Sequence, residues 1–238
     1  MKTICIENER EEVYENLRTK KQVCEEAKLE FSHIETDPIE HCLHSVKKFL
    51  KDIIKVVGAK EYTIYVGEGK NFRHELYPEY KAGRPPKPLL AAEIQRYLVE
   101  HWDAVVCTEI EADDQMGIDQ CSSEESTIIC TIDKDLDMIP GKHFNWNKDS
   151  FYEIDRDQAE RFFWKQVLMG DSVDNIIGLK GIGEKRALKL MEDIETKDLK
   201  DLVRDKYIEH EREEDFNLNC KLLWILRKPL GETYNEIS

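Results

Sequence analysis

The chain has 238 residues, enough to bury a hydrophobic core, and a net charge of −15 at pH 7. This excess of acidic residues excludes non-specific binding of the whole surface to nucleic acid, and no apolar run is long enough to span a membrane. Seven cysteines without a Cys-x-x-Cys pair predict reduced thiols. Together these features predict a soluble, cytoplasmic protein with no membrane partner.

The first part of the chain carries one strong helical pattern. Residues 1–36 are charged and weakly patterned, with a short strand expected at residues 3–6. Asp37 and Pro38 then predict the start of a helix that ends at Gly58. Apolar residues recur in it at helical spacing and predict a stripe that faces the core. The stripe consists of Ile39, Cys42, Leu43, Val46, Leu50, Ile53, Ile54 and Val57.

Further along, β-rich runs alternate with helical patterns. Strands are predicted at residues 62–66, 104–108 and 127–132, and a further strand and turn at residues 144–152. Helices are predicted at residues 89–101, between the strands at 104–108 and 127–132, at residues 158–169, and from residue 197 onward. Repeated strand–helix units predict an α/β fold with a mainly parallel sheet flanked by helices. Functional groups gather at the carboxyl ends of the strands in such folds.

Three groups of acidic residues stand at the ends of predicted strands or helices. They are Glu111, Asp113 and Asp114; Asp133 and Asp135; and Asp171 and Asp174. Each group taken alone is also explained by helix capping or by a solvated loop. Three such groups together favour a metal site, because clustered carboxylates repel one another unless cations lie between them. Oxygen-only ligands suit Mg²⁺ or Mn²⁺.

Two basic stretches complement these acids. Residues 69–87 carry five Lys or Arg against two Glu, and residues 180–189 carry four against one. In the second stretch, glycines lead into a helix opened by Glu184, Lys185 and Arg186. Glycines before a helix N-terminus let backbone N–H groups approach a phosphate closely, and the helix dipole favours its negative charge. The sequence therefore predicts a phosphate cradle beside a metal site.

The motifs FRHELYPEYKAGR, EADD, TIDKDLDMIPG and GDSVDNIIGLKGIGEKRA occur in this order within residues 60–193. In this order they resemble the motifs of the 5′-nuclease family, which comprises bacteriophage 5′–3′ exonucleases, flap endonucleases and the 5′-nuclease domain of bacterial DNA polymerase I. The resemblance implies a PIN-like α/β nuclease core over residues 1–157. It also implies a helical C-terminal part over residues 158–238, with a helix–three-turn–helix DNA-binding element at about residues 175–190.

The same resemblance implies the roles of individual residues. It implies a site for two Mg²⁺ or Mn²⁺ ions, held by Glu111, Asp113, Asp114, Asp133, Asp135, Asp171 and Asp174. Lys81 and Arg84 match the family's catalytic basic residues near the scissile phosphate. The DNA-binding residues would be Arg73, Tyr80, Lys81, Arg84, Gly178, Gly181, Gly183, Lys185 and Arg186, with Tyr80 stacking on a terminal base. A K⁺ ion is a further expected ligand of the helix–three-turn–helix.

The implied function is structure-specific hydrolysis of DNA by two-metal catalysis, as a 5′–3′ exonuclease or flap endonuclease. The protein's partners would be DNA with 5′ ends or flaps, and RNA–DNA hybrids are a further candidate. The protein would act as a monomer in the cytoplasm, which for a bacteriophage protein is the cytoplasm of the host. The sequence departs from the family at its start, where a strand ending in an Asp ligand is expected to be missing before Asp37. Two alternatives therefore stay open: a catalytically impaired DNA-binding homologue, and a PIN-type ribonuclease, which GLKGIGEKRA disfavours.

Overall fold

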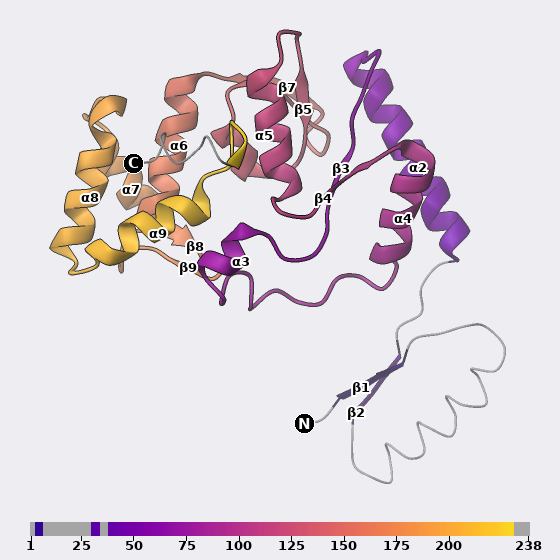
Figure 1. Cartoon of the computed structure of the whole chain (residues 1–238), viewed down its shortest axis with the longest axis horizontal. Helices are drawn as coiled ribbons and strands as arrows, with labels where there is room; N and C mark the ends of the chain where they lie inside the picture. Colours follow the sequence, from indigo (N-terminus) through magenta and orange to yellow (C-terminus); the bar gives the residue numbers. More distant parts are fainter. Residues whose placement is uncertain (1–2, 7–29, 34–37, 231–238) are drawn as a thin grey trace. The chain divides into compact units, whose positions relative to one another are not determined.

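The computed structural model describes residues 3–6, 30–33 and 38–230 (Figure 1). The chain forms two compact units, residues 1–50 with 87–97 and residues 51–86 with 98–238. The first unit contains a parallel pair of strands, β1 (Thr3–Ile6) and β2 (Glu30–His33), so the short strand expected at the start is present. The division between the units falls within two helices, α2 (Ile39–Val57) and α4 (Ala91–Trp102).

Helix α2 confirms one prediction and corrects another. It begins directly after Pro38 and ends before Gly58, whose positive φ of 67° stops the helix. However, no residue of α2 is buried, and its apolar stripe is only half-buried. Two apolar residues of α2 outside the stripe, Phe49 and Val56, are 43% and 50% exposed. An apolar stripe thus shows which side of a helix is less exposed, but not how fully a neighbouring element covers that side.

The second unit holds the other strands in small sheets. Strand β3 (Tyr65–Gly67) pairs in parallel with β4 (Val105–Cys107). Strand β5 (Ile128–Cys130) pairs in parallel with β6 (Gly141–Asn145), and β6 pairs in antiparallel fashion with β7 (Ser150–Ile154). The α/β class and the parallel pairing are confirmed. Among the described residues, however, these strands form separate ladders rather than one continuous sheet.

Helices follow the strands as the alternating pattern predicts. They are α5 (Ala112–Ser122), the 3₁₀ helix η1 (Lys134–Met138), α6 (Arg156–Met169), α7 (Glu184–Met191), the 3₁₀ helix η2 (Thr196–Asp198), α8 (Leu199–Glu209) and α9 (Glu213–Leu223). One short helix, α3 (Phe72–Leu76), lies in the basic stretch of residues 69–87, for which no helix was predicted from the sequence. It begins there because the side chain of Asn71 accepts a hydrogen bond from the backbone N–H of Arg73.

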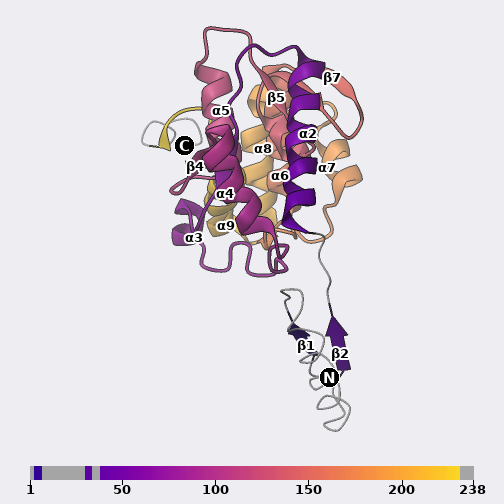
Figure 2. The ribbon, with the colours of Figure 1, turned by 90° about the vertical axis from the view of Figure 1, so that its right-hand side faces the viewer.

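Helix α6 is the centre of the second unit's core. It contacts η1, α7, α8 and α9, and Figure 2 shows it beside α8. Its buried face contains Phe163, Val167 and Leu168, and burial of each such side chain contributes about 1.5–3 kcal/mol. The predicted division after residue 157 falls inside this helix. No helix in the described part of the chain is both long and apolar enough to cross a membrane.

Candidate metal centre and phosphate-binding residues

The predicted acidic groups come together within the second unit. Burial raises the pKa of Asp113 to about 7, with further increases from the nearby charges of Asp133 and Glu111. Burial likewise raises the pKa of Asp135 to about 6, together with the charges of Asp133, Asp171 and Asp174. These couplings connect the start of α5, the residues after β5 and the turn after α6. The fold therefore gathers carboxylates from three separate segments.

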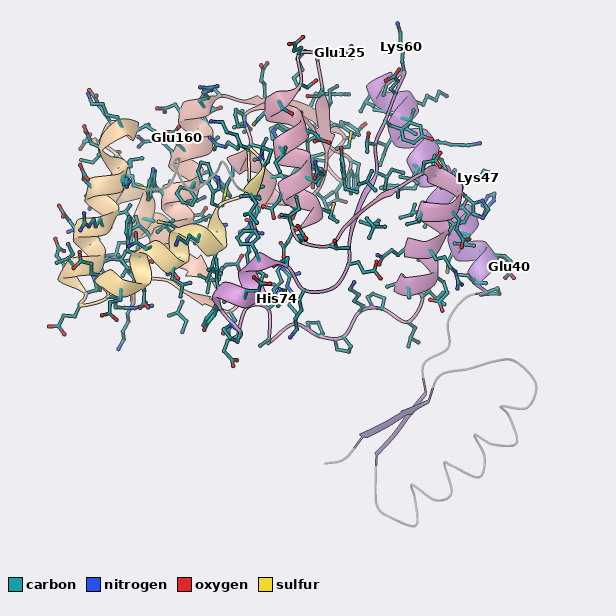
Figure 3. The ribbon with its side chains drawn as sticks, in the orientation of Figure 1. Glu40, Lys47, Lys60, His74, Glu125 and Glu160 are labelled. Atoms are coloured by element: carbon teal, nitrogen blue, oxygen red, sulfur yellow. The ribbon has the colours of Figure 1, made fainter. Side chains whose placement is uncertain are left out.

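The two basic residues expected at the scissile phosphate lie directly against these carboxylates. Lys81 Nζ is 2.6 Å from Glu111 Oε1 and 3.7 Å from Asp174 Oδ2. Arg84 pairs with Asp174 through Nε, at 3.0 Å from Oδ1, and through Nη2. Burial alone would raise the pKa of Glu111, but the charges of Arg73 and Lys81 outweigh it and lower that pKa. The loop that follows α3 thus neutralises part of the acidic cluster. Helix α3 is the helix in which Figure 3 labels His74.

The loop of Lys81 is fastened to the turn that carries Asp174. The Lys81 backbone N–H donates to the carbonyl oxygen of Asp174 at 3.0 Å. The Asn175 side-chain amide donates to the carbonyl oxygen of Glu79 at 2.9 Å. Within the turn, Asp171 Oδ1 accepts from the N–H of Val173 at 2.7 Å. These bonds fix the relative positions of the basic loop and the acidic pair that follows α6.

The donor set fits a hard divalent cation in its chemistry. The neighbouring carboxylates supply oxygen ligands, and their mutual repulsion is what bound cations relieve. In the described part of the chain, however, no three Asp, Glu, His or Cys side chains are close enough to hold an ion between them. Lys81 and Arg84 instead occupy carboxylate oxygens of Glu111 and Asp174. The carboxylates are neighbours, and the assignment of individual ligands remains a prediction.

Two of the expected roles are corrected by a buried ion pair. Arg73, expected to bind DNA, is 2% exposed and donates through Nη1 and Nη2 to both oxygens of Asp114, at 2.6 and 2.8 Å. Asp114, expected to bind metal, is 0% exposed, and its oxygens also accept from the N–H groups of Glu111 and Leu226. Both side chains are buried and their charges are satisfied by each other inside the protein, so neither is placed to contact DNA or a metal in this structure.

Tyr80 also differs from its expected role. Its side chain is 3% exposed, and its hydroxyl lies 3.1 Å from Asp174 Oδ2 and 3.3 Å from Glu111 Oε1. Burial and the charge of Glu111 raise the pKa of Tyr80, so its hydroxyl stays protonated and able to donate. A ring this deeply buried offers no face to a terminal base. Tyr80 instead connects the acidic residues of two segments.

The structure gives different reasons for the presence of glycine at the positions in and before the expected phosphate cradle. Gly170 lies in the ladder of β8 (Gly170–Asp171) and β9 (Ile176–Ile177), and Gly178 directly follows β9 and packs against Gly170. A Cβ on Gly178 would approach the Met169 carbonyl carbon to 2.0 Å, so packing alone excludes any side chain there. Gly183 precedes α7 and would have open space around a Cβ. The role of Gly183 as a phosphate contact stays a prediction.

Helix α7 presents its basic residues to solvent. Lys185 and Arg186 are exposed in its first turn, while Ala187 and Met191 pack into the core. The Arg186 guanidinium contacts the carbonyl oxygen of Gly181, which has a φ of 79°. Because α7 has a buried and an exposed side, the two basic side chains point away from the core. They remain predicted phosphate contacts.

Three residues that hydrogen-bond to parts of the candidate site were not singled out in the sequence. Gln166 donates from Nε2 to Asp135 Oδ1 at 2.7 Å. Arg212 and Asn219 hold the turn before α7, donating to the backbone carbonyl oxygens of Gly178 and Ile177, respectively. Gln166 had a weak signal, since it is a polar residue on the apolar side of a predicted helix. Arg212 stands in the acidic run HEREED, where the sequence indicates only a solvated surface.

Comparisons with known proteins agree with this architecture. DNA polymerase I of Pseudomonas aeruginosa is 34% identical over an alignment of 149 residues, and the match covers 54% of this chain and 16% of that polymerase. The 5′-3′ exonuclease of Bacillus subtilis is 30% identical over an alignment of 186 residues, and the match covers 65% of this chain and 60% of that protein. This chain therefore spans less than two thirds of the length of either relative.

A solved structure shows the same fold. Bacteriophage T5 5′-exonuclease with bound zinc ions aligns with a TM-score of 0.61 at 24% identity, over 76% of this chain and 80% of that one. The family model of the 5′-3′ exonuclease N-terminal resolvase-like domain matches residues 31–163, more than half of the chain. The chain therefore belongs to the family of 5′-3′ exonucleases that carry this N-terminal resolvase-like domain.

Proposed function

We propose that this protein hydrolyses phosphodiester bonds of DNA at or near 5′ ends, as a structure-specific 5′–3′ exonuclease or flap endonuclease. The observation that carries the proposal is that a cluster of carboxylates and two basic side chains lie together. Carboxylates from three segments, among them Asp113, Asp135 and Asp174, lie beside Lys81 and Arg84. Carboxylates suit divalent cations, and Lys and Arg suit a phosphodiester.

Six carboxylates are the proposed metal ligands: Glu111, Asp113, Asp133, Asp135, Asp171 and Asp174. Two Mg²⁺ or Mn²⁺ ions held by them would lower the pKa of a bound water and stabilise charge on the attacking and leaving oxygens. Lys81 and Arg84 would be placed to contact a phosphate bound at these ligands, because their side chains already contact Glu111 and Asp174. With the charges of Glu111 and Asp174 neutralised by bound cations, the side chains of Lys81 and Arg84 would be available to a phosphate.

The duplex would be bound through its backbone by the start of α7. Lys185 and Arg186 are exposed there, and Gly183 leaves the N-terminal N–H groups accessible. Such contacts read no bases, so the enzyme would select the structure of its DNA rather than the sequence. We propose that it acts as a monomer in the cytoplasm, with RNA–DNA hybrids as a second substrate and K⁺ as a further ligand near α7.

The test is a panel of end-labelled substrates incubated with the purified protein and Mg²⁺ or Mn²⁺. The panel contains a 5′-flap duplex, a blunt duplex, an RNA–DNA hybrid and a single-stranded RNA of the same sequence. We expect cleavage of the flap and the blunt duplex near their 5′ ends, and none in EDTA. Cleavage of RNA alone would support the ribonuclease alternative and contradict the proposal.

A DNA-binding protein without activity is the second alternative. It predicts retention of the flap duplex in a gel-shift assay and no product at any Mg²⁺ or Mn²⁺ concentration. A substrate whose 5′ end is blocked by a bulky group provides the control for end recognition. Loss of cleavage on blocking the 5′ end, but not on blocking the 3′ end, is the result expected of a 5′ nuclease.

A further inference from the structure

Gln166 is a buried polar side chain on the otherwise apolar inner side of α6. It is 3% exposed, and its Nε2 lies 2.7 Å from Asp135 Oδ1. The direction of this hydrogen bond is fixed by chemistry, because an ionised carboxylate only accepts and the amide nitrogen only donates. The bond joins α6 to η1, two elements that pack against each other.

The helix that carries Gln166 holds it in one place. Phe163, Val167 and Leu168 are buried around it, at 1%, 0% and 0% exposure. A side chain in so tightly packed a setting has lost its rotamer freedom on folding, so the hydrogen bond costs little additional ordering. Gln166 therefore presents its amide to Asp135 as a fixed donor.

Asp135 needs such a donor, because its carboxylate lies near those of Asp133, Asp171 and Asp174. Repulsion from these charges would turn an untethered side chain toward water. The bond to Gln166 holds Oδ1, while Oδ2 has no hydrogen-bond partner in the described part of the chain. Asp135 is thus held by one oxygen and open at the other.

A second amide–carboxylate pair in the same unit shows the contrast. Gln115 Nε2 donates to Asp119 Oδ1 at 2.8 Å, nearly the same length as the bond from Gln166. The other oxygen of Asp119 is taken by the Tyr65 hydroxyl, so both oxygens are occupied. The two pairs share their first bond and differ in whether the second oxygen is left for a ligand.

We propose that Gln166 is a positioning residue that holds Asp135 by Oδ1 so that Oδ2 is offered to a divalent cation. This inference rests on the proposed function, which places Asp135 among the metal ligands. Hydrogen-bonding partners of metal ligands commonly change metal affinity or activity by about 10- to 100-fold when they are removed. Gln166 is neutral, so it orients the carboxylate without cancelling the charge that attracts the cation.

The test measures binding of Mn²⁺ alone to the full chain, by electron paramagnetic resonance of the free ion and without DNA. Gln166→Met keeps the length and packing of the side chain but removes the donor, and Gln166→Leu does the same with a different shape. We expect both variants to bind Mn²⁺ about 10- to 100-fold more weakly than the parent. The matched control Gln115→Met removes the same kind of bond from Asp119 and should leave Mn²⁺ affinity unchanged.

The inference is overturned if either folded Gln166 variant binds Mn²⁺ as tightly as the parent does. It is also overturned if Gln115→Met loses as much Mn²⁺ affinity as the Gln166 variants, or if the parent binds no Mn²⁺. Thermal melting in EDTA shows whether each variant is folded. The Mg²⁺ concentration for half-maximal flap cleavage should rise with the loss of Mn²⁺ affinity, which a general loss of stability would not produce. Whether the parent cleaves DNA decides the proposed function, whereas the affinity ratio decides the role of Gln166.

Discussion

Arg73 and Asp114 form a two-pronged ion pair at 2.6 and 2.8 Å, with side chains only 3% and 0% exposed. Arg73 also donates to the carbonyl oxygens of Leu222 and Trp224, and Asp114 accepts from the N–H of Leu226. The pair thereby ties the start of α5 to the chain after α9. It stabilises the segment that carries Glu111 and Asp113 rather than contacting a ligand itself.

Breaking this pair on one side should strongly destabilise the fold. Arg73→Met leaves Asp114 buried without its counter-ion, which costs about 3–5 kcal/mol. Urea unfolding monitored by circular dichroism measures the change in the free energy of unfolding. Arg84→Met is the matched control, because Arg84 is 46% exposed in its ion pair and contributes little to stability.

The double variant Arg73→Met with Asp114→Leu separates charge from packing. We expect it to recover much of the lost stability, because no buried charge is then left uncompensated. A double variant less stable than Arg73→Met alone would show that packing, and not the unpaired carboxylate, causes the loss.

The contribution of Asp113 to the stability of the metal-free protein should fall as the pH rises from about 4 to 7. The pKa of Asp113 is about 7 in the folded chain and ordinarily 3.8, so between these values the folded state binds more protons than the unfolded state. The Asp113 contribution to stability therefore decreases with increasing pH in this window, and the raised pKa of Asp135 acts in the same direction, whereas the lowered pKa of Glu111 acts in the opposite one. Melting temperatures in EDTA at several pH values test this dependence.

Asp113→Asn is the variant that isolates this effect. It removes a carboxylate that is costly to ionise, so we expect a flatter pH dependence and a higher melting temperature at pH 7. Asp137→Asn, a change of charge in the same unit, is the control and should keep the parent's slope. A parent whose melting temperature rises steadily from pH 4 to 7, with Asp113→Asn unchanged from it, would contradict this account.

The sequence predicted what depends on local spacing and missed what depends on distant partners. The start of α2 follows from Pro38, and the strand–helix alternation follows from the apolar pattern. Arg73 looked like a phosphate contact because it lies in a basic stretch. Its real partners are 41 to 151 residues away along the chain, and no local pattern reveals them.

The role of Tyr80 in the candidate site also depends on partners that are distant in the sequence. Its place in the motif suggested a stacking surface, but its burial and its contacts with Glu111 and Asp174 arise only when separate segments fold together. The acidic groups were recognisable because strand and helix ends put functional groups at one edge. Which of them is consumed by an internal ion pair, as Asp114 is, depends on tertiary packing.

The basic residues of α7 should contribute mainly to the salt dependence of DNA binding. Lys185→Ala with Arg186→Ala removes two exposed cations at the helix start, and each lost phosphate contact should lower the log–log salt slope by about one unit. Fluorescence anisotropy of a labelled duplex over a range of KCl concentrations measures the slope in EDTA. Lys148→Ala, in the turn between β6 and β7, provides the control and should keep the parent's slope. An unchanged slope in the α7 variant would show that this helix does not contact the DNA backbone.

The most direct test of the account is single-turnover cleavage of a 5′-flap duplex in Mg²⁺ by the parent, Asp135→Asn and Asp137→Asn. Asp135 and Asp137 both lie in η1, but only Asp135 is a proposed ligand, and the amide oxygen introduced by Asp137→Asn would still accept the hydrogen bond that Asp137 receives from Tyr152. We expect Asp135→Asn to retain less than about a tenth of the parent rate while binding the duplex normally, because metal catalysis is worth several kcal/mol. Asp137→Asn should cleave like the parent. Equal cleavage rates for the parent and Asp135→Asn would contradict the metal-dependent mechanism proposed for this site.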